Sequence, residues 1–207
     1  ARRHIEKIVK NEKLSIWRVL PGTTESDFQY EKEFRESNTI GVGYWMDNLD
    51  LTDFTEDEVK KKCDSIFTMK YPQKIRAPPA MKAAVTAITH KITPKDIVVL
   101  TRGEKEVIDF GIVTSKYFFD AKNETGYHQR RKVVWLNQGP ISKAVLPVIS
   151  QGPSSALWQF SEKNEEKIIE FLLGEKREII EEDLIENVQT YDTLPPSDYS
   201  KILKDDL

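Results

Sequence analysis

Three aromatic residues near glycines and predicted loops are the candidate ligand-binding residues of this sequence. Tyr44 and Trp45 follow the apolar, glycine-containing segment 40–43, and Tyr127 precedes a basic segment that ends at Trp135. An aromatic ring stacks on the π-face of a nucleobase, a contact worth about 1–3 kcal/mol. We therefore interpret Tyr44, Trp45 and Tyr127 as candidate walls of an aromatic pocket. Trp135 alternates with a valine and is expected to pack inward.

The separate roles of Tyr44 and Trp45 stay open. Neighbouring side chains of a strand point to opposite faces, so one ring should pack in the core while the other faces a pocket. Both rings could also be packing residues. The two glycines of segment 40–43 leave one surface of the strand bare, which permits close approach of a ligand or of another backbone.

Basic residues gather in the same part of the sequence as Tyr127. They are Lys116, Lys122, Arg130, Arg131 and Lys132. Such side chains contact phosphates, which provides affinity and salt dependence but no sequence preference. Charge runs are also common on solvated surfaces, so the residues are candidate phosphate contacts. Trp17 and Arg18, in the first apolar motif, complete the set of candidate nucleic-acid-binding residues.

Motifs of familiar catalytic chemistry are missing from the sequence. It contains no Gly-x-x-x-x-Gly-Lys phosphate loop and no Gly-x-Ser-x-Gly nucleophile elbow. Three scattered histidines and the single cysteine do not predict a zinc site. Asp47, Glu58 and Lys60 have a nuclease-like spacing, but the last two fall in a predicted helix. We therefore expect a binding domain without a metal or cofactor, not an enzyme.

Composition indicates the class of protein. The chain has 207 residues, enough for one sizeable core. Cys63 is its only cysteine, which excludes an internal disulfide framework and fits a reducing compartment. No apolar run approaches the roughly 20 residues of a membrane-spanning helix. We predict a cytoplasmic protein, and its many Lys, Glu and Ile residues suggest a thermophilic source.

Charge is unevenly distributed along the chain. The net charge is −3, yet residues 175–207 carry ten acidic and four basic residues, a net −6 that leaves residues 1–174 at +3. A local basic patch matters more for phosphate contact than the total charge does. We predict one nucleic-acid-binding domain over 1–174, followed by an acidic helical or linker tail over 175–207.

The periodicity of apolar residues predicts a mixture of strands and helices. Apolar segments bounded by turn residues predict strands at 14–20, 39–46, 96–101, 107–118 and 131–137. Helices are predicted at 56–68, at 80–90, and from Ser161 to Gly174. Thr55 and Glu58 have the spacing of a capping box before the first helix, and two prolines precede the second. We expect polar or irregular connections at 23–37, where Phe28, Tyr30 and Phe34 are possible anchors, and at 138–156.

The order of the apolar motifs resembles a known family. The motifs are Trp17-Arg18-Val19-Leu20-Pro21-Gly22, Ile40-Gly41-Val42-Gly43-Tyr44-Trp45, Lys95-Asp96-Ile97-Val98-Val99-Leu100, Phe110-Gly111-Ile112-Val113-Thr114 and His128-Gln129-Arg130-Arg131-Lys132-Val133-Val134-Trp135. Together they resemble the EVE/YTH-like branch of the PUA superfamily. They are most similar to the versions at the N-terminus of McrB-type, modification-dependent restriction proteins.

This resemblance implies an α+β fold, a PUA-like mixed β-barrel flanked by helices. It also implies DNA binding, with a modified base flipped into an aromatic pocket. Tyr44 or Trp45 would then be one cage aromatic and Tyr127 the other, where YTH readers usually have tryptophan. In McrB-type proteins such a domain precedes a GTP-hydrolysing AAA+ motor, which works with a separate nuclease subunit. The tail would lead toward such a motor, and the isolated domain would be a monomer.

Two alternatives remain open at this stage. Barrels that stack bases serve both polymers, so the domain could be an RNA reader of the same superfamily. It could also be a protein-interaction domain whose exposed aromatics contact a partner chain. The sequence leaves open which base modification is read.

Overall fold

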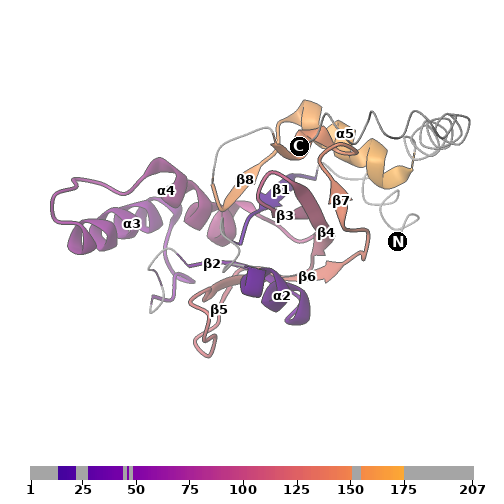
Figure 1. Ribbon diagram of the computed structural model, residues 1–207. Coiled ribbons are helices and arrows are strands. Elements are labelled where there is room, and N and C mark those ends of the chain that lie inside the picture. The colour runs from indigo at the N-terminus through magenta and orange to yellow at the C-terminus, as the bar shows by residue number, and fades with distance from the viewer. Residues whose placement is uncertain (1–13, 22–27, 44–45, 47–48, 151–154, 175–207) are drawn as a thin grey trace, which may run out of the picture.

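The computed structural model describes residues 14–21, 28–43, 46, 49–150 and 155–174 (Figure 1). Eight strands in these residues form one sheet. The strands are β1 (Ile16–Val19), β2 (Thr39–Val42), β3 (Ile97–Arg102), β4 (Glu106–Val113), β5 (Phe118–Phe119), β6 (Gln129–Trp135), β7 (Ile141–Ser142) and β8 (Leu157–Gln159). Their order is β2-β6-β4-β3-β1-β8, with β5 paired to β6 and β7 paired to β4.

The sheet curls into half a barrel (Figure 1). β1 and β3 run parallel, and the other pairs of strands in the described residues are antiparallel. Asp96 fixes the parallel pair, because its carboxylate accepts hydrogen bonds from the Ser15 backbone (3.0 Å), the Trp17 indole (3.1 Å) and the Thr93 backbone (2.9 Å). The expected α+β class is confirmed.

Helices cover both faces of the curled sheet (Figure 1). They are α2 (Phe28–Glu36), α3 (Glu56–Lys70), α4 (Pro79–Thr86) continuing into the π-helical turn η2 (Ala87–Lys91), the 3-10 turn η3 (Pro147–Ser150) and α5 (Glu162–Leu173). Within the described residues, no helix combines the length and the apolar character needed to cross a membrane.

Both faces of the sheet are buried, and β3 shows this most clearly. Its side chains alternate between two hydrophobic clusters: Val98 and Leu100 join the cluster that includes α3 and α4, whereas Ile97 and Val99 join the cluster that includes α5. This explains the continuous apolar run in the sequence, since a strand covered on both faces needs no polar alternation. The core therefore lies on either side of β3.

Local sequence signals account for the helix ends. The predicted capping box of α3 is confirmed: the Thr55 backbone donates to Glu58 Oε2 (2.8 Å) and the Glu58 backbone donates to Thr55 Oγ1 (3.4 Å). Pro79 occupies the first turn of α4, where its missing N–H is no loss. Gly174 ends α5 with a φ of 82°, a left-handed conformation suited to glycine.

The structure differs from the sequence-based expectation in four elements. Residues 28–36 form α2 instead of an irregular connection, with Phe34 fully buried as its anchor. The expected strand 107–118 ends at Val113 and pairing resumes only in β5. The short strands β7 and β8 were not expected, because two or three residues are too few to show periodicity.

Candidate nucleic-acid site

Tyr127 lies where the ends of β1 and β2 meet the start of β6. A Cβ added to Gly41 of β2 would stand only 3.3 Å from Tyr127 Cβ and 3.2 Å from the carbonyl oxygens of Tyr127 and Gln129. Gly41 therefore permits the close approach expected for this strand, and the approaching group is the backbone of the protein itself. The Tyr127 hydroxyl donates to the carbonyl of Pro21, the residue that follows β1 by two positions.

Helix α2 supports the ring of Tyr127 from its other side. The ring is tilted against Tyr30 with 4.8 Å between centroids, and it meets Phe34 edge-on at 5.2 Å. Such aromatic contacts add about 0.5–1.5 kcal/mol beyond the burial of area. Half-buried Tyr127 is therefore held in one orientation by β1, β2 and α2.

The segment that follows β2 is anchored to β6 by a buried amide. Gln129 Nε2 donates to the carbonyls of Met46 (2.9 Å) and Leu49 (3.0 Å). Tyr117 completes the network: its hydroxyl donates to Gln129 Oε1 (2.6 Å) and accepts from the Leu51 backbone (3.1 Å). Burial raises the pKa of Tyr117 to about 12, so the hydroxyl keeps its proton at neutral pH.

This network fixes the chain on the C-terminal side of the two candidate cage aromatics. Tyr44 and Trp45 themselves lie outside the described residues. Gly43, directly before them, and Met46, directly after them, are both placed. The described residues thus place Gly41, three positions before Tyr44, in contact with Tyr127.

Arg130 is buried, whereas the sequence suggested an exposed edge of basic side chains. Only 1% of Arg130 is exposed. Its guanidinium donates to Glu33 Oε2 (2.7 Å), to the Tyr127 carbonyl (2.6 Å) and to Thr39 Oγ1, and it lies over the ring of Phe34. These contacts join β6, β2 and α2, so Arg130 stabilises the support of Tyr127.

Arg131 is buried on the opposite side, against η2. It donates to the carbonyls of Ile88 (2.6 Å), Thr89 (3.0 Å) and Ser115 (3.2 Å). Burial lowers its pKa to about 10, which still leaves it charged at neutral pH. Both arginines are inside because β6 is covered by α2 and by η2. The exposed cations of this region are Lys116, Lys122 and Lys132.

Trp17 and Arg18 are also buried, in β1. Trp17 is 4% exposed and bonds to Asp96, as described above. Arg18 is 1% exposed and donates to Thr101 Oγ1 (3.0 Å) and to the Gly103 carbonyl, and burial lowers its pKa. Both residues hold β1 against β3 and its turn.

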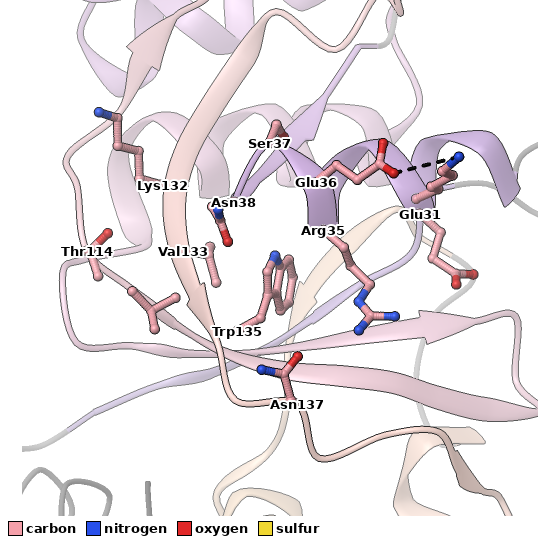
Figure 2. A pocket seen from close by; sticks show the side chains of 12 residues that line it. Glu31, Arg35, Glu36, Ser37, Asn38, Thr114, Lys132, Val133, Trp135 and Asn137 are labelled. Carbon is pink, nitrogen blue, oxygen red and sulfur yellow. Dashed lines mark ion pairs between the residues drawn. The ribbon is translucent and has the colours of Figure 1, made fainter.

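A hollow of about 870 Å³ lies between α2 and β6 (Figure 2). Trp135 forms part of its wall and donates to the Phe34 carbonyl (3.2 Å), so the expected inward orientation is confirmed at 8% exposure. Gly111 makes room for this ring, since an added Cβ would lie 2.9 Å from it. Arg35 in the same wall pairs with buried Asp109 at 3.7 Å. The charged side chains around this hollow are Lys32, Arg35 and Lys132 together with Glu31 and Glu36, and Lys32 pairs with Glu36 at 3.6 Å (Figure 2).

The described residues show no arrangement suited to metal or thiol chemistry. They contain no group of three or more metal-ligating side chains. Glu58 caps α3 and Lys60 pairs with Glu56 at 2.7 Å, while Asp47 lies outside the described residues. Cys63 is fully buried, and burial raises the pKa of its thiol to about 11. It is the core thiol that the apolar stripe of its helix predicts.

Two residues of this cluster, Gln129 and Tyr117, carry no signal in the sequence that marks them as functional. A glutamine at the start of a strand shows no pattern that separates a buried amide from an exposed one. Tyr117 lies at the end of a predicted strand, where a tyrosine is ordinary. Their shared role depends on a segment 66 to 83 residues away in the sequence, from Met46 to Leu51, and only the folded chain shows it.

These features define a mixed α+β domain with a curled half-barrel sheet and an aromatic and amide cluster where β1, β2 and β6 meet. A family model described as a domain of unknown function, DUF8426, matches residues 17–153. The match covers most of the chain, and the protein belongs to this family. The matched range runs from Trp17 in β1 past β7 and thus includes the whole cluster around Tyr127. No curated protein gives a match to the sequence.

Proposed function

We propose that this protein is the DNA-recognition module of a McrB-type, modification-dependent restriction system, with a PUA-like fold. In this proposal a base leaves the duplex and stacks in a pocket between Tyr127 and one ring of the pair Tyr44 and Trp45. The order of motifs supports the fold, and so does a curled sheet with flanking helices.

The observation that carries the proposal is the contact between Tyr127 and Gly41. It fixes an aromatic residue beside the strand that leads, two residues later, to Gly43 and the candidate cage aromatics. Moving a base out of the stack costs a few kcal/mol. A rigid pocket recovers that cost better than a mobile one, since it loses less conformational entropy on binding.

Fixed neighbours supply this rigidity. Gln129 and Tyr117 hold the chain after Trp45, and Arg130 holds the backbone of Tyr127 through its carbonyl. The exposed ammonium groups of Lys116, Lys122 and Lys132 supply the phosphate contacts in this proposal. Such contacts give salt-dependent affinity, whereas the pocket gives the preference for one base.

Alanine variants of the two cage aromatics test the proposal. Equilibrium binding is measured to one duplex with and without the preferred base modification. We expect Tyr44→Ala or Trp45→Ala to abolish the preference while leaving salt-dependent binding to the unmodified duplex. If both folded variants keep the full preference, the pocket is elsewhere.

Trp158→Phe is the matched control for these variants. Trp158 lies in β8, at the opposite end of the strand order from β2, and its indole nitrogen has no hydrogen-bond partner among the described residues. Replacing it removes an indole without changing the region of Tyr127, so the base preference should stay. A matched RNA strand in the same assay separates the DNA proposal from an RNA reader, because an RNA reader would bind it more tightly.

A further inference from the structure

The helical hairpin of α3 and α4 extends away from the sheet and ends in an exposed loop (Figure 1). Helix α3 has 15 residues and is about 22 Å long. Its buried face, at Val59, Cys63 and Phe67, joins the core cluster. The tip of the hairpin, residues 69–76, thus lies at the end of a projection from the sheet (Figure 1).

The tip presents apolar side chains to solvent. Ile75 is 91% exposed and Met69 is 71% exposed, and only Val134, at 55%, is a further exposed large hydrophobic residue among those described. Solvent exposure of one apolar residue is ordinary. An almost fully exposed isoleucine between two charged residues, at the end of a projecting hairpin, is a feature that binding would explain.

Hydrogen bonds hold the tip in place despite this exposure. The Tyr71 backbone donates to the Phe67 carbonyl (2.9 Å), and the Lys74 backbone donates to the Tyr71 carbonyl (2.9 Å). The Ala77 backbone donates to Asp64 Oδ1 (2.7 Å), and Lys82 pairs with the same carboxylate (3.0 Å). Ile75 is therefore presented by a loop that is bonded to the hairpin on both sides.

The charge of the tip has one sign. Segment 69–76 contains three basic residues, Lys70, Lys74 and Arg76, and no acidic residue. Lys74 and Arg76 are exposed and flank Ile75 directly. An apolar side chain between cations matches the surface of a nucleic-acid duplex, where sugars and base edges in the minor groove lie between two rows of phosphates.

We propose that the tip of the α3–α4 hairpin is a second nucleic-acid contact, in addition to the pocket beside Tyr127. Lys74 and Arg76 bind phosphates of the duplex that flanks the captured base, and Ile75 lies against its minor groove. This inference rests on the proposed function, since the duplex is the same one. The tip would contact the part of this duplex that lies beyond the captured base. A membrane surface fits less well, because a membrane-binding helix needs a wide apolar face.

The salt dependence of binding to a 20-base-pair duplex tests the inference. Each phosphate contact contributes about 0.9 to the slope of log K against log salt. We expect the double variant Lys74→Ala/Arg76→Ala to lower the slope by about 1.8 and the affinity near 0.15 M salt by roughly 10- to 30-fold. Ile75→Ala should weaken binding without changing the slope. The preference for a modified base should stay in both variants, because the pocket is untouched.

The control variant is Lys143→Ala/Lys163→Ala, which removes two exposed lysines near β7 and in α5, on the other side of the sheet (Figure 1). Thermal unfolding shows that each variant is folded. If the tip variants bind with the wild-type slope and affinity, the inference is wrong while the proposed function stands. If the wild type binds no duplex, the proposed function is wrong, and the inference that rests on it is wrong as well. Tip-dependent binding to anionic lipid vesicles without binding to DNA would also overturn the inference.

Discussion

Tyr127 rests directly against Gly41, with only 3.3 Å between Tyr127 Cβ and the position that a Cβ on Gly41 would occupy. This contact joins the residue before β6 to the strand that leads to Tyr44 and Trp45. The geometry explains why β2 contains a glycine where a β-branched residue would otherwise be favoured.

Adding bulk at Gly41 should displace Tyr127. Gly41→Val places methyl groups against the backbone of Tyr127 and Gln129, and overpacking of this kind costs about 1–3 kcal/mol. We expect a lower midpoint in urea unfolding together with a loss of base preference. Ala144→Val is the control, because Ala144 is exposed in a turn. A stable Gly41→Val protein with unchanged preference would contradict the role given to this contact.

Replacing Gln129 should release the segment after Trp45. Gln129→Leu leaves the carbonyls of Met46 and Leu49 without this donor, and each unsatisfied buried group costs about 1–3 kcal/mol. Chemical denaturation should show that the free energy of unfolding falls by an amount within that range or above it. The variant should also lose its preference for the modified base. Gln159→Leu removes an amide in β8 whose hydrogen bonds, to Ser15 Oγ and Glu165 Oε1, are both exposed to solvent, and it should change neither. Equal stability of the two leucine variants would show that the Gln129 network contributes nothing.

Arg130 and Lys132 should behave differently although they are two residues apart. Arg130→Met removes the donor to Glu33, Thr39 and the Tyr127 carbonyl. Each buried group left unsatisfied costs about 1–3 kcal/mol, so we expect marked destabilisation. Lys132→Met should leave stability unchanged and reduce the salt slope of DNA binding by about one phosphate contact. Urea unfolding and titration at several salt concentrations measure the two effects. A stable Arg130→Met protein with a reduced slope would instead identify Arg130 as a phosphate contact.

Cys63 should be unreactive in the folded protein. Its thiol is fully buried and burial raises its pKa from 9.0 to about 11, so Ellman's reagent at pH 8 should label it only after unfolding. Because the folded state prefers the protonated thiol, this stabilisation is present below pH 9 and is lost between pH 9 and 11. Cys63→Ala should remove that part of the pH dependence of unfolding. Rapid labelling of the native protein would contradict the burial.

Structural features that depend on residues close together in the sequence are predictable from local signals. Thr55 and Glu58 marked the start of α3, and the apolar run at β3 marked a strand. The burial of Arg130 and Arg131 was not predictable in this way, because it depends on α2 and η2 covering β6 from two sides. The same holds for Gln129, whose partners lie far away in the sequence. The sequence shows where an arginine or lysine occurs, whereas the packing of the folded chain decides whether a phosphate can reach its side chain.

Equilibrium binding of the wild-type protein to one duplex tests the central claim most directly. The duplex is prepared unmodified, adenine-methylated and cytosine-methylated, and each form is measured at two salt concentrations. We predict tighter binding to one modified form, with an affinity for every form that falls as salt rises. Equal binding of all three forms, or no binding to any of them, would contradict the proposal that this domain reads a modified base.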